Sequence, residues 1–209
     1  MSKFNWILDA GHGGIINGEY ITPGKRSPIW SDGSQYFEGV GNRNIVKKLI
    51  QKLDEKSIDN VDLLEGTQAD IPLHDRAYRA NKIYHSDNKS VLVSIHSNGF
   101  TSESANGFSV YTSRGETKSD LIATMFIKNM ELYFPKHKSR KDYTDGDPDK
   151  EANFYILKKT SCPAILIENF FMTNFRESKL LMSTEFQDRI VECHLQTILE
   201  IENSEAFIF

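Results

Sequence analysis

Four residues at the expected ends of strands and helices have side chains that can bind a metal ion or move a proton. His12 and His96 each follow an apolar run that reads as a strand, Glu168 ends another such run, and Glu38 stands where a helix is expected to begin. Two imidazoles and one carboxylate are the ligand set of many catalytic zinc sites, in which water takes the fourth position. A second carboxylate then remains for proton transfer.

The glycines around His12, in the stretch ILDAGHGG at residues 7–14, also raise the possibility of a phosphate-binding loop. Such loops need either G-x-G-x-x-G or a Lys-Ser/Thr end, and this stretch has neither. A neutral imidazole is a better metal ligand than a phosphate contact. The loop therefore favours a metal ion over a phosphate.

Each of the four residues also has a structural explanation. His12 can hydrogen-bond within its loop, His96 can be a core histidine with a partner, and Glu38 can favour the positive end of a helix. Taken singly, these explanations are favoured over a metal site. Glu168 is harder to explain in this way, because a buried carboxylate without a partner is costly.

The hydrophobic pattern alternates between strand-like and helix-like segments, which is typical of an α/β domain. Strands are expected at residues 4–8, 61–65, 91–95, 107–112, 154–157 and 164–168. Helices are expected around residues 46–53, 122–133 and 191–199, with a short one after Pro72. Ligands of α/β sheets collect at the carboxyl ends of the strands, where His12, His96 and Glu168 are expected.

Length and charge limit the classes of function. A chain of 209 residues is expected to form one domain, spanning residues 1–209, and a monomer. The net charge of −4 gives no basic surface for nucleic acid or anionic membrane, and no apolar run approaches the ~20 residues of a membrane span. Cys162 and Cys193 lie in apolar surroundings, so both are expected to be reduced and buried.

Two polar segments, residues 15–37 and 136–153, are longer than ordinary connections and are expected to be functional or mobile loops. The acidic stretch D-G-D-P-D at 145–149 lacks the placed glycine and distal glutamate of an EF-hand, so no calcium site is expected. With the basic run 136–141 it is expected to form a solvated loop near the cleft rim. The remaining histidines are all expected to be solvated: His74, His85, His137 and His194.

Six motifs occur along almost the whole chain: LDAGHGG (8–14), E-G-V-G-N (38–42), L-H-D-R-A-Y-R-A-N (73–81), SIHSNGF (94–100), ANGFSVY (105–111) and CPAILIENFFMTN (162–174). In these motifs and in their order the chain resembles the zinc-dependent N-acetylmuramoyl-L-alanine amidases. That family includes bacterial cell-separation amidases, spore-cortex amidases and phage endolysins.

The resemblance implies a mixed, mostly parallel sheet of about six strands flanked by helices, in a phosphorylase/hydrolase-like arrangement. It implies that His12, Glu38 and His96 bind Zn²⁺ and that Glu168 is the catalytic glutamate. The bond cleaved would join N-acetylmuramic acid to L-alanine in peptidoglycan. Asn98 is expected to bind substrate or orient a ligand, whereas a loop-capping role suits Asp9 at least as well.

The chain departs from the family pattern at Glu65-Gly66, where Thr-Arg is common, and at Phe170, where glycine is usual. The segment before Glu38 carries four aromatic residues that are expected to shape the cleft wall: Tyr20, Trp30, Tyr36 and Phe37.

Two other functions remain open from the sequence: a zinc peptidase such as a carboxypeptidase, and a wall-binding protein that keeps the fold without catalysis. No signal peptide is recognisable at the start of the sequence. Both a phage-type lysin made in the cytoplasm and a secreted enzyme without its leader agree with this.

Overall fold

A six-stranded sheet forms the centre of the protein in a computed structural model that describes residues 2–207. Its strands lie in the order β4-β1-β5-β8-β6-β7. Neighbouring strands run parallel except β6 and β8, which pair antiparallel. The strands are β1 (Asn5–Ala10), β4 (Asn60–Asp62), β5 (Ser90–Asn98), β6 (Ser109–Thr112), β7 (Lys150–Glu151) and β8 (Ala164–Phe171). This arrangement confirms the expected mixed, mostly parallel sheet.

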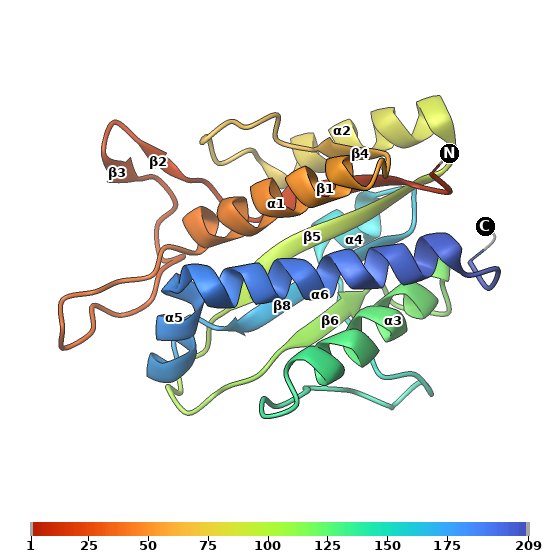
Figure 1. The fold of residues 1–209 in the computed structure, drawn as a ribbon. Helices are drawn as coiled ribbons and strands as arrows, with labels where there is room; N and C mark the ends of the chain where they lie inside the picture. Colours follow the sequence, from red (N-terminus) through yellow and green to blue (C-terminus); the bar gives the residue numbers. More distant parts are fainter. Residues whose placement is uncertain (1, 208–209) are drawn as a thin grey trace.

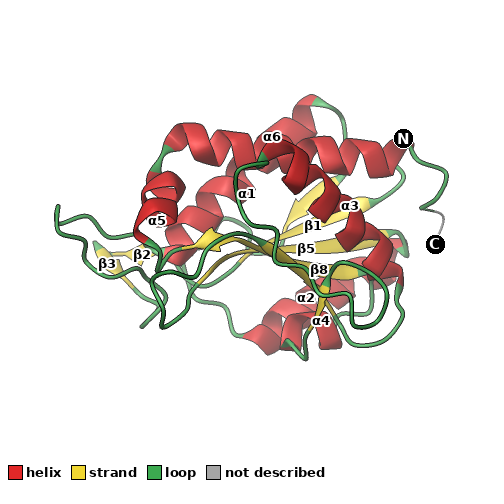
Figure 2. Cartoon of the chain, turned by 90° about the horizontal axis from the view of Figure 1, so that it is seen from below, coloured by secondary structure: helices red, strands yellow, loops and turns green. Residues whose placement is uncertain are grey.

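Helices cover both faces of the sheet (Figures 1 and 2). One face carries α1 (Glu38–Glu55), α3 (Lys118–Tyr133), α5 (Phe175–Met182) and α6 (Thr184–Asn203). The other carries α2 (Leu73–Asp87) and α4 (Tyr155–Lys159). The long helix α6 packs against both α1 and α3, so these three helices form one continuous layer.

The central strands β1, β5 and β8 are largely apolar on both sides because both faces of the sheet are covered. Successive side chains of a strand point to opposite faces, so β1 sends Trp6 and Leu8 into the large core under α1, α3 and α6. Between them, Ile7 joins Leu92 and Leu166 in a smaller core under α2 and α4. Most of the buried apolar surface therefore lies on the side of α6.

Residues 154–157 form a helix rather than the expected strand. Phe154 precedes α4, in which Ile156 and Leu157 are buried in the smaller core. A run of four apolar residues is too short to distinguish a strand from a buried helical turn. The sixth strand of the sheet is instead β7, and a separate hairpin forms from β2 (Ile15–Ile16) and β3 (Glu19–Tyr20) within the first polar segment.

Two of the four histidines expected to be solvated are not. His194 is fully buried within α6, and its Nε2 lies 3.1 Å from Oδ1 of Asn169. His137 packs against the rings of Phe134, Phe170 and Phe186. The expectation holds for His74 and His85, which are exposed.

The polar segment 136–153 runs along the β6 edge of the sheet, where Arg140 N donates to Phe108 O. It does not form the expected solvated loop throughout, because Asp149 is only 2% exposed. Cys162 and Cys193 are both free and buried, as expected.

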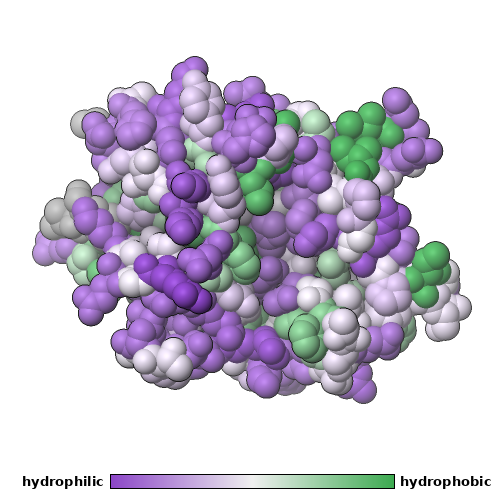
Figure 3. Space-filling view, turned by 180° about the vertical axis from the view of Figure 1, so that it is seen from behind, coloured by the Kyte–Doolittle hydropathy of each residue, from purple (hydrophilic) through white to green (hydrophobic). Residues whose placement is uncertain are grey.

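The face turned away in Figure 1 is mostly hydrophilic, with hydrophobic side chains in separate patches (Figure 3). Among residues 2–207 no helix combines the length and the apolar character needed to cross a bilayer.

Candidate active site

A cleft of about 1000 Å³ opens at the carboxyl ends of β1, β5 and β8. This is the edge at which α/β sheets usually bind their ligands. All five residues singled out from the sequence line it: His12, Glu38, His96, Asn98 and Glu168. The structure therefore brings together residues that lie far apart in the chain.

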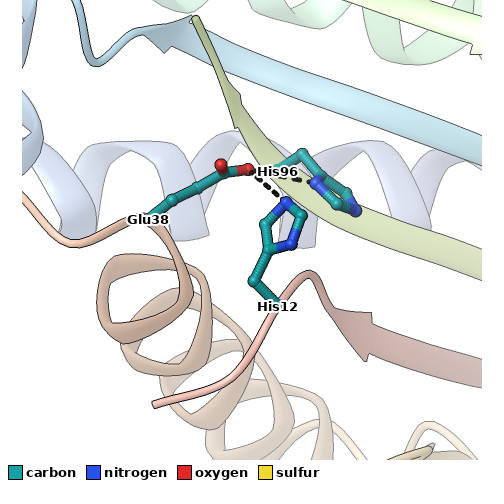
Figure 4. Close-up of side chains that lie close together, drawn as sticks. All are labelled: His12, Glu38 and His96. Atoms are coloured by element: carbon teal, nitrogen blue, oxygen red, sulfur yellow. Dashed lines mark hydrogen bonds and ion pairs between the residues drawn. The ribbon is translucent and has the colours of Figure 1, made fainter. Parts of the chain in front are cut away.

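His12, Glu38 and His96 converge on one point of this cleft (Figure 4). Oε1 of Glu38 lies 3.3 Å from Nε2 of His12 and 3.1 Å from Nδ1 of His96. The two imidazole rings meet edge to face, with 4.9 Å between their centroids. One ligand atom from each residue lies within 4.8 Å of the others, a spacing that suits a single metal ion.

The electrostatics keep a negative charge at the centre of this cluster. Burial alone would raise the pKa of Glu38, but hydrogen bonds with His12 and His96 outweigh burial and hold the pKa well below its ordinary value. Burial lowers the pKa of His96, and the Glu38 carboxylate more than reverses that effect, so the pKa is raised overall. The Glu38 carboxylate therefore stabilises positive charge beside it, whether on a protonated imidazole or on a bound cation.

The backbone near the cluster explains the glycine before His12. A Cβ on Gly11 would lie 2.2 Å from Cε1 of His96, so no larger residue fits beside the imidazole. His12 itself has φ 67°, a left-handed conformation that is uncommon outside glycine. On the other side, Glu38 begins α1, and its backbone N–H donates to Lys25 O.

Glu168 lies on β8 directly beside His96, its parallel pairing partner on β5. Its Oε2 atom is buried and has no hydrogen-bond partner among residues 2–207. Burial raises the pKa of Glu168 to about 7, and the nearby Glu38 charge adds to this while His96 opposes it. A carboxyl group with a pKa near neutrality can both accept and release a proton at physiological pH.

A β-bulge lies immediately after Glu168. His96 pairs with Glu168, but Asn98 pairs with Phe171, so β8 contains one extra residue. Phe170 has φ 62°, the left-handed conformation that glycine adopts in bulges of this kind. The left-handed conformation explains why glycine is usual at this position of the family pattern. It also means that the backbone of Phe170 is strained.

Two arginines, the buried Arg76 and the half-buried Arg43, hold the loop that carries His12, and the residue pattern offered no reason to assign them this role. Arg76 donates to the carbonyls of Ala10 and His12, at 2.7 and 3.1 Å. Arg43 donates to His12 O from the other side, at 2.6 Å. Arg76 stands within one of the recognised motifs, which is the only signal that pointed to it.

The cleft wall differs from the expectation. Trp30 and Tyr36 are buried, and the four aromatic residues named from the sequence lie outside the lining of the cleft as described over residues 2–207. The aromatic lining comes instead from Phe100, Phe154 and Tyr155.

Lys25 also lines the cleft, and its charge acts on Glu168. Asn98 lies in the lining of the cleft, and its binding of substrate stays a prediction.

The chain is similar to known proteins over most of its length. The family model described as N-acetylmuramoyl-L-alanine amidase matches residues 7–200. The endolysin of Bacillus phage SPP1 is 30% identical over 210 residues, covering 97% of this chain and 67% of that protein. The N-acetylmuramoyl-L-alanine amidase AmiA of Salmonella typhimurium is 29% identical, covering 90% of this chain and 73% of that protein.

A solved structure has the same fold over nearly the whole chain. The N-acetylmuramoyl-L-alanine amidase of Clostridium difficile superposes with a TM-score of 0.78 at 29% identity, covering 98% of this chain and 100% of that one. The match therefore includes the sheet and the helices on both of its faces.

Proposed function

The chain belongs to the N-acetylmuramoyl-L-alanine amidase family, and we propose that it cleaves its substrate with one zinc ion held by His12, Glu38 and His96. The family activity is hydrolysis of the amide between N-acetylmuramic acid and L-alanine in peptidoglycan. The observation that carries the zinc proposal is the convergence of two imidazoles and one buried carboxylate within 4.8 Å.

The residues fit a zinc ion by their chemistry. Imidazole nitrogen and carboxylate oxygen are both common zinc ligands, and three protein ligands leave a position open for catalysis. Glu38 is buried and ionised, so its charge needs a nearby cation for compensation. A zinc ion at such a site supplies a Lewis acid for the scissile carbonyl and lowers the pKa of water.

Glu168 is the group that we assign to proton transfer. Its carboxyl lines the same cleft and has a pKa of about 7, so it can take a proton from the attacking water. It can then deliver that proton to the departing amine of L-alanine, which is a poor leaving group without it. Asn98, on the strand that carries His96, is proposed to contact the substrate.

We further propose that this chain works as one catalytic domain, because one sheet with helices on both faces accounts for the described residues. We also propose that it acts as a monomer. Peptidoglycan is then the partner, and the cell wall is the place of action.

Digestion of purified peptidoglycan tests the bond that is cleaved. The proposal predicts new amino termini of L-alanine on released peptides, whereas a carboxypeptidase would release free D-alanine. Elemental analysis of the same preparation should give about one zinc per chain, and His12→Ala and His96→Ala should each remove it. Full zinc content in His96→Ala, or activity without zinc, would contradict the assignment.

A further inference from the structure

A second cluster of possible metal ligands lies at the β6–β7 edge of the sheet, outside the catalytic cleft. Asp120, in the first turn of α3, meets Asp147 and Asp149, which precede β7. One carboxylate oxygen from each lies within 4.8 Å of the others. None of the three belongs to the lining of the cleft as described over residues 2–207.

Asp149 distinguishes this cluster from an ordinary group of surface acids, because its side chain is buried. It is 2% exposed, and its Oδ2 accepts a hydrogen bond from Thr112 Oγ1 over 2.6 Å. The other oxygen, Oδ1, is buried and has no hydrogen-bond partner among residues 2–207. A buried carboxylate oxygen without a donor is costly, which indicates that something else compensates it.

The neighbouring acids increase that cost. Burial raises the pKa of Asp149 to about 7, and the charges of Asp147 and Asp120 add to the effect. Burial also raises the pKa of Asp120. Three carboxylates at this spacing therefore repel one another when all are ionised, and a cation among them would reverse the repulsion.

We propose that Asp120, Asp147 and Asp149 bind a calcium ion. The donors are all oxygen, which favours a hard cation over zinc, and Ca²⁺ accepts irregular sets of carboxylates, carbonyls and waters. The site differs from an EF-hand because one ligand, Asp120, comes from α3 rather than from the loop that carries Asp147 and Asp149. Gly146, with φ 111°, allows the sharp turn that brings Asp147 and Asp149 toward that helix.

The expected consequence is structural. Thr112 ends β6 and pairs with Glu151 of β7, so the hydrogen bond to Asp149 already links the loop to the sheet edge. A calcium ion would join this loop to the first turn of α3 as well. Binding should therefore stabilise the segment 142–151 against local opening, because the ion binds only the closed arrangement.

Thermal unfolding of the zinc-loaded enzyme, after exchange into zinc-containing buffer from which calcium is absent, tests the proposal. At a calcium concentration about 100-fold above Kd, Tm should rise by roughly 5–10 °C. Isothermal titration should give one site per chain. Asp147→Asn should abolish both signals, whereas Asp145→Asn, a change at an exposed acid of the same loop, should leave them intact. Zinc content is measured throughout and should stay constant.

Three results would overturn the proposal: no calcium response in the unsubstituted protein, the same response in Asp147→Asn, or an equal response to magnesium. Protonation of Asp149 is the competing explanation for its unpartnered oxygen. In that case Asp149→Asn would raise Tm in the absence of calcium at neutral pH, and calcium would have no effect on the unsubstituted protein.

Discussion

Asp9 and Arg76 form an ion pair in the protein interior, with 2.6 Å between Oδ1 of Asp9 and Nη1 of Arg76. Both side chains are at most 3% exposed. The other oxygen of Asp9 accepts a hydrogen bond from Ser94, and the guanidinium reaches on to the carbonyl of His12. The pair thus connects β1 and β5 to the backbone of a proposed zinc ligand, a structural role for Asp9 close to the loop-capping one.

We expect Arg76→Lys to weaken both zinc binding and the fold. Lysine keeps the charge beside Asp9, but it lacks the planar fork that reaches Asp9 and the carbonyls of Ala10 and His12 together. Loss of such outer partners typically costs about 10–100-fold in metal affinity. The unsatisfied carbonyl should also lower the free energy of unfolding by about 1–3 kcal/mol. Competition with a zinc chelator and urea unfolding measure the two effects.

Arg79→Lys is the matched control, because Arg79 lies on the same helix and donates to Leu63 O, away from the His12 loop. It should leave zinc affinity unchanged. Equal zinc affinity in Arg76→Lys and the unsubstituted protein would show that Arg76 supports only the fold.

Phe170 combines backbone strain with tight packing, and two substitutions separate them. Its ring packs at 5.0 to 5.9 Å from its aromatic neighbours Phe108, Phe134, His137 and Phe186. Phe170→Ala should lower the free energy of unfolding by about 3–5 kcal/mol through the cavity. Phe170→Gly leaves the larger cavity but relieves the left-handed strain, so it should be about 1 kcal/mol more stable than Phe170→Ala.

Urea unfolding of both variants checks this order. If Phe170→Ala proved the more stable of the two, the left-handed conformation at the bulge would be wrong or without cost.

The sequence predicted the longer elements and the ligand set for different reasons. Long apolar runs such as 91–95 and 164–168 indicate strands because both faces of the sheet are buried. The pattern failed at 154–157, where four residues carry no period, and it missed α5. Expected strand and helix ends suggested grouping His12, Glu38 and His96, but assigning them as ligands rested on the order of the motifs, because distance along the chain says nothing about distance in space.

Three other features of the structure could not be predicted from the sequence pattern. The burial of His194 could not be predicted, because a histidine on an amphipathic helix reads as polar until the layer formed by α1, α3 and α6 is known. Arg76 donates to the backbone carbonyl of His12, and a hydrogen bond to a backbone acceptor cannot be predicted from the type of the accepting residue. Likewise, the acid of α3 that meets Asp147 and Asp149 lies outside the acidic stretch that drew attention to them.

His194 should make the fold sensitive to acid. Burial lowers the pKa of His194 to about 3, whereas an unfolded histidine has its ordinary value near 6.5. Above pH 6.5 neither state is protonated. Below pH 6.5 His194 binds a proton in the unfolded chain but not in the folded chain. The free energy of unfolding therefore falls as the pH drops from 6.5 toward 3.

The measurement is the free energy of unfolding of metal-free protein against pH, compared with His194→Gln. Glutamine can still donate to Asn169, but it does not titrate. The advantage of the unsubstituted protein over the variant should shrink by about 1.4 kcal/mol per pH unit within this window. His85→Gln, at an exposed position of α2, should instead follow the unsubstituted protein; a constant difference for His194→Gln would exclude His194 as the cause.

Glu168→Gln separates catalysis from metal binding and folding. The amide keeps the size of the carboxyl and part of its hydrogen-bonding capacity, but it cannot accept the proton of water or return it to the leaving amine. Zinc content and Tm should therefore stay close to those of the unsubstituted protein. Because general acid–base groups contribute about 10²–10⁴-fold, kcat on muropeptides should fall by at least roughly 100-fold.

Glu177→Gln is the matched control, because it makes the same chemical change at another buried carboxyl whose pKa burial raises to about 7. Glu177 accepts hydrogen bonds from the backbone N–H groups of Gly107 and Phe171 and lies outside the cleft lining described over residues 2–207. Its substitution should lower Tm while kcat per folded molecule is kept, because glutamine offers one acceptor oxygen where two are used. A folded, zinc-loaded Glu168→Gln protein with more than about a tenth of the normal kcat would end the catalytic assignment.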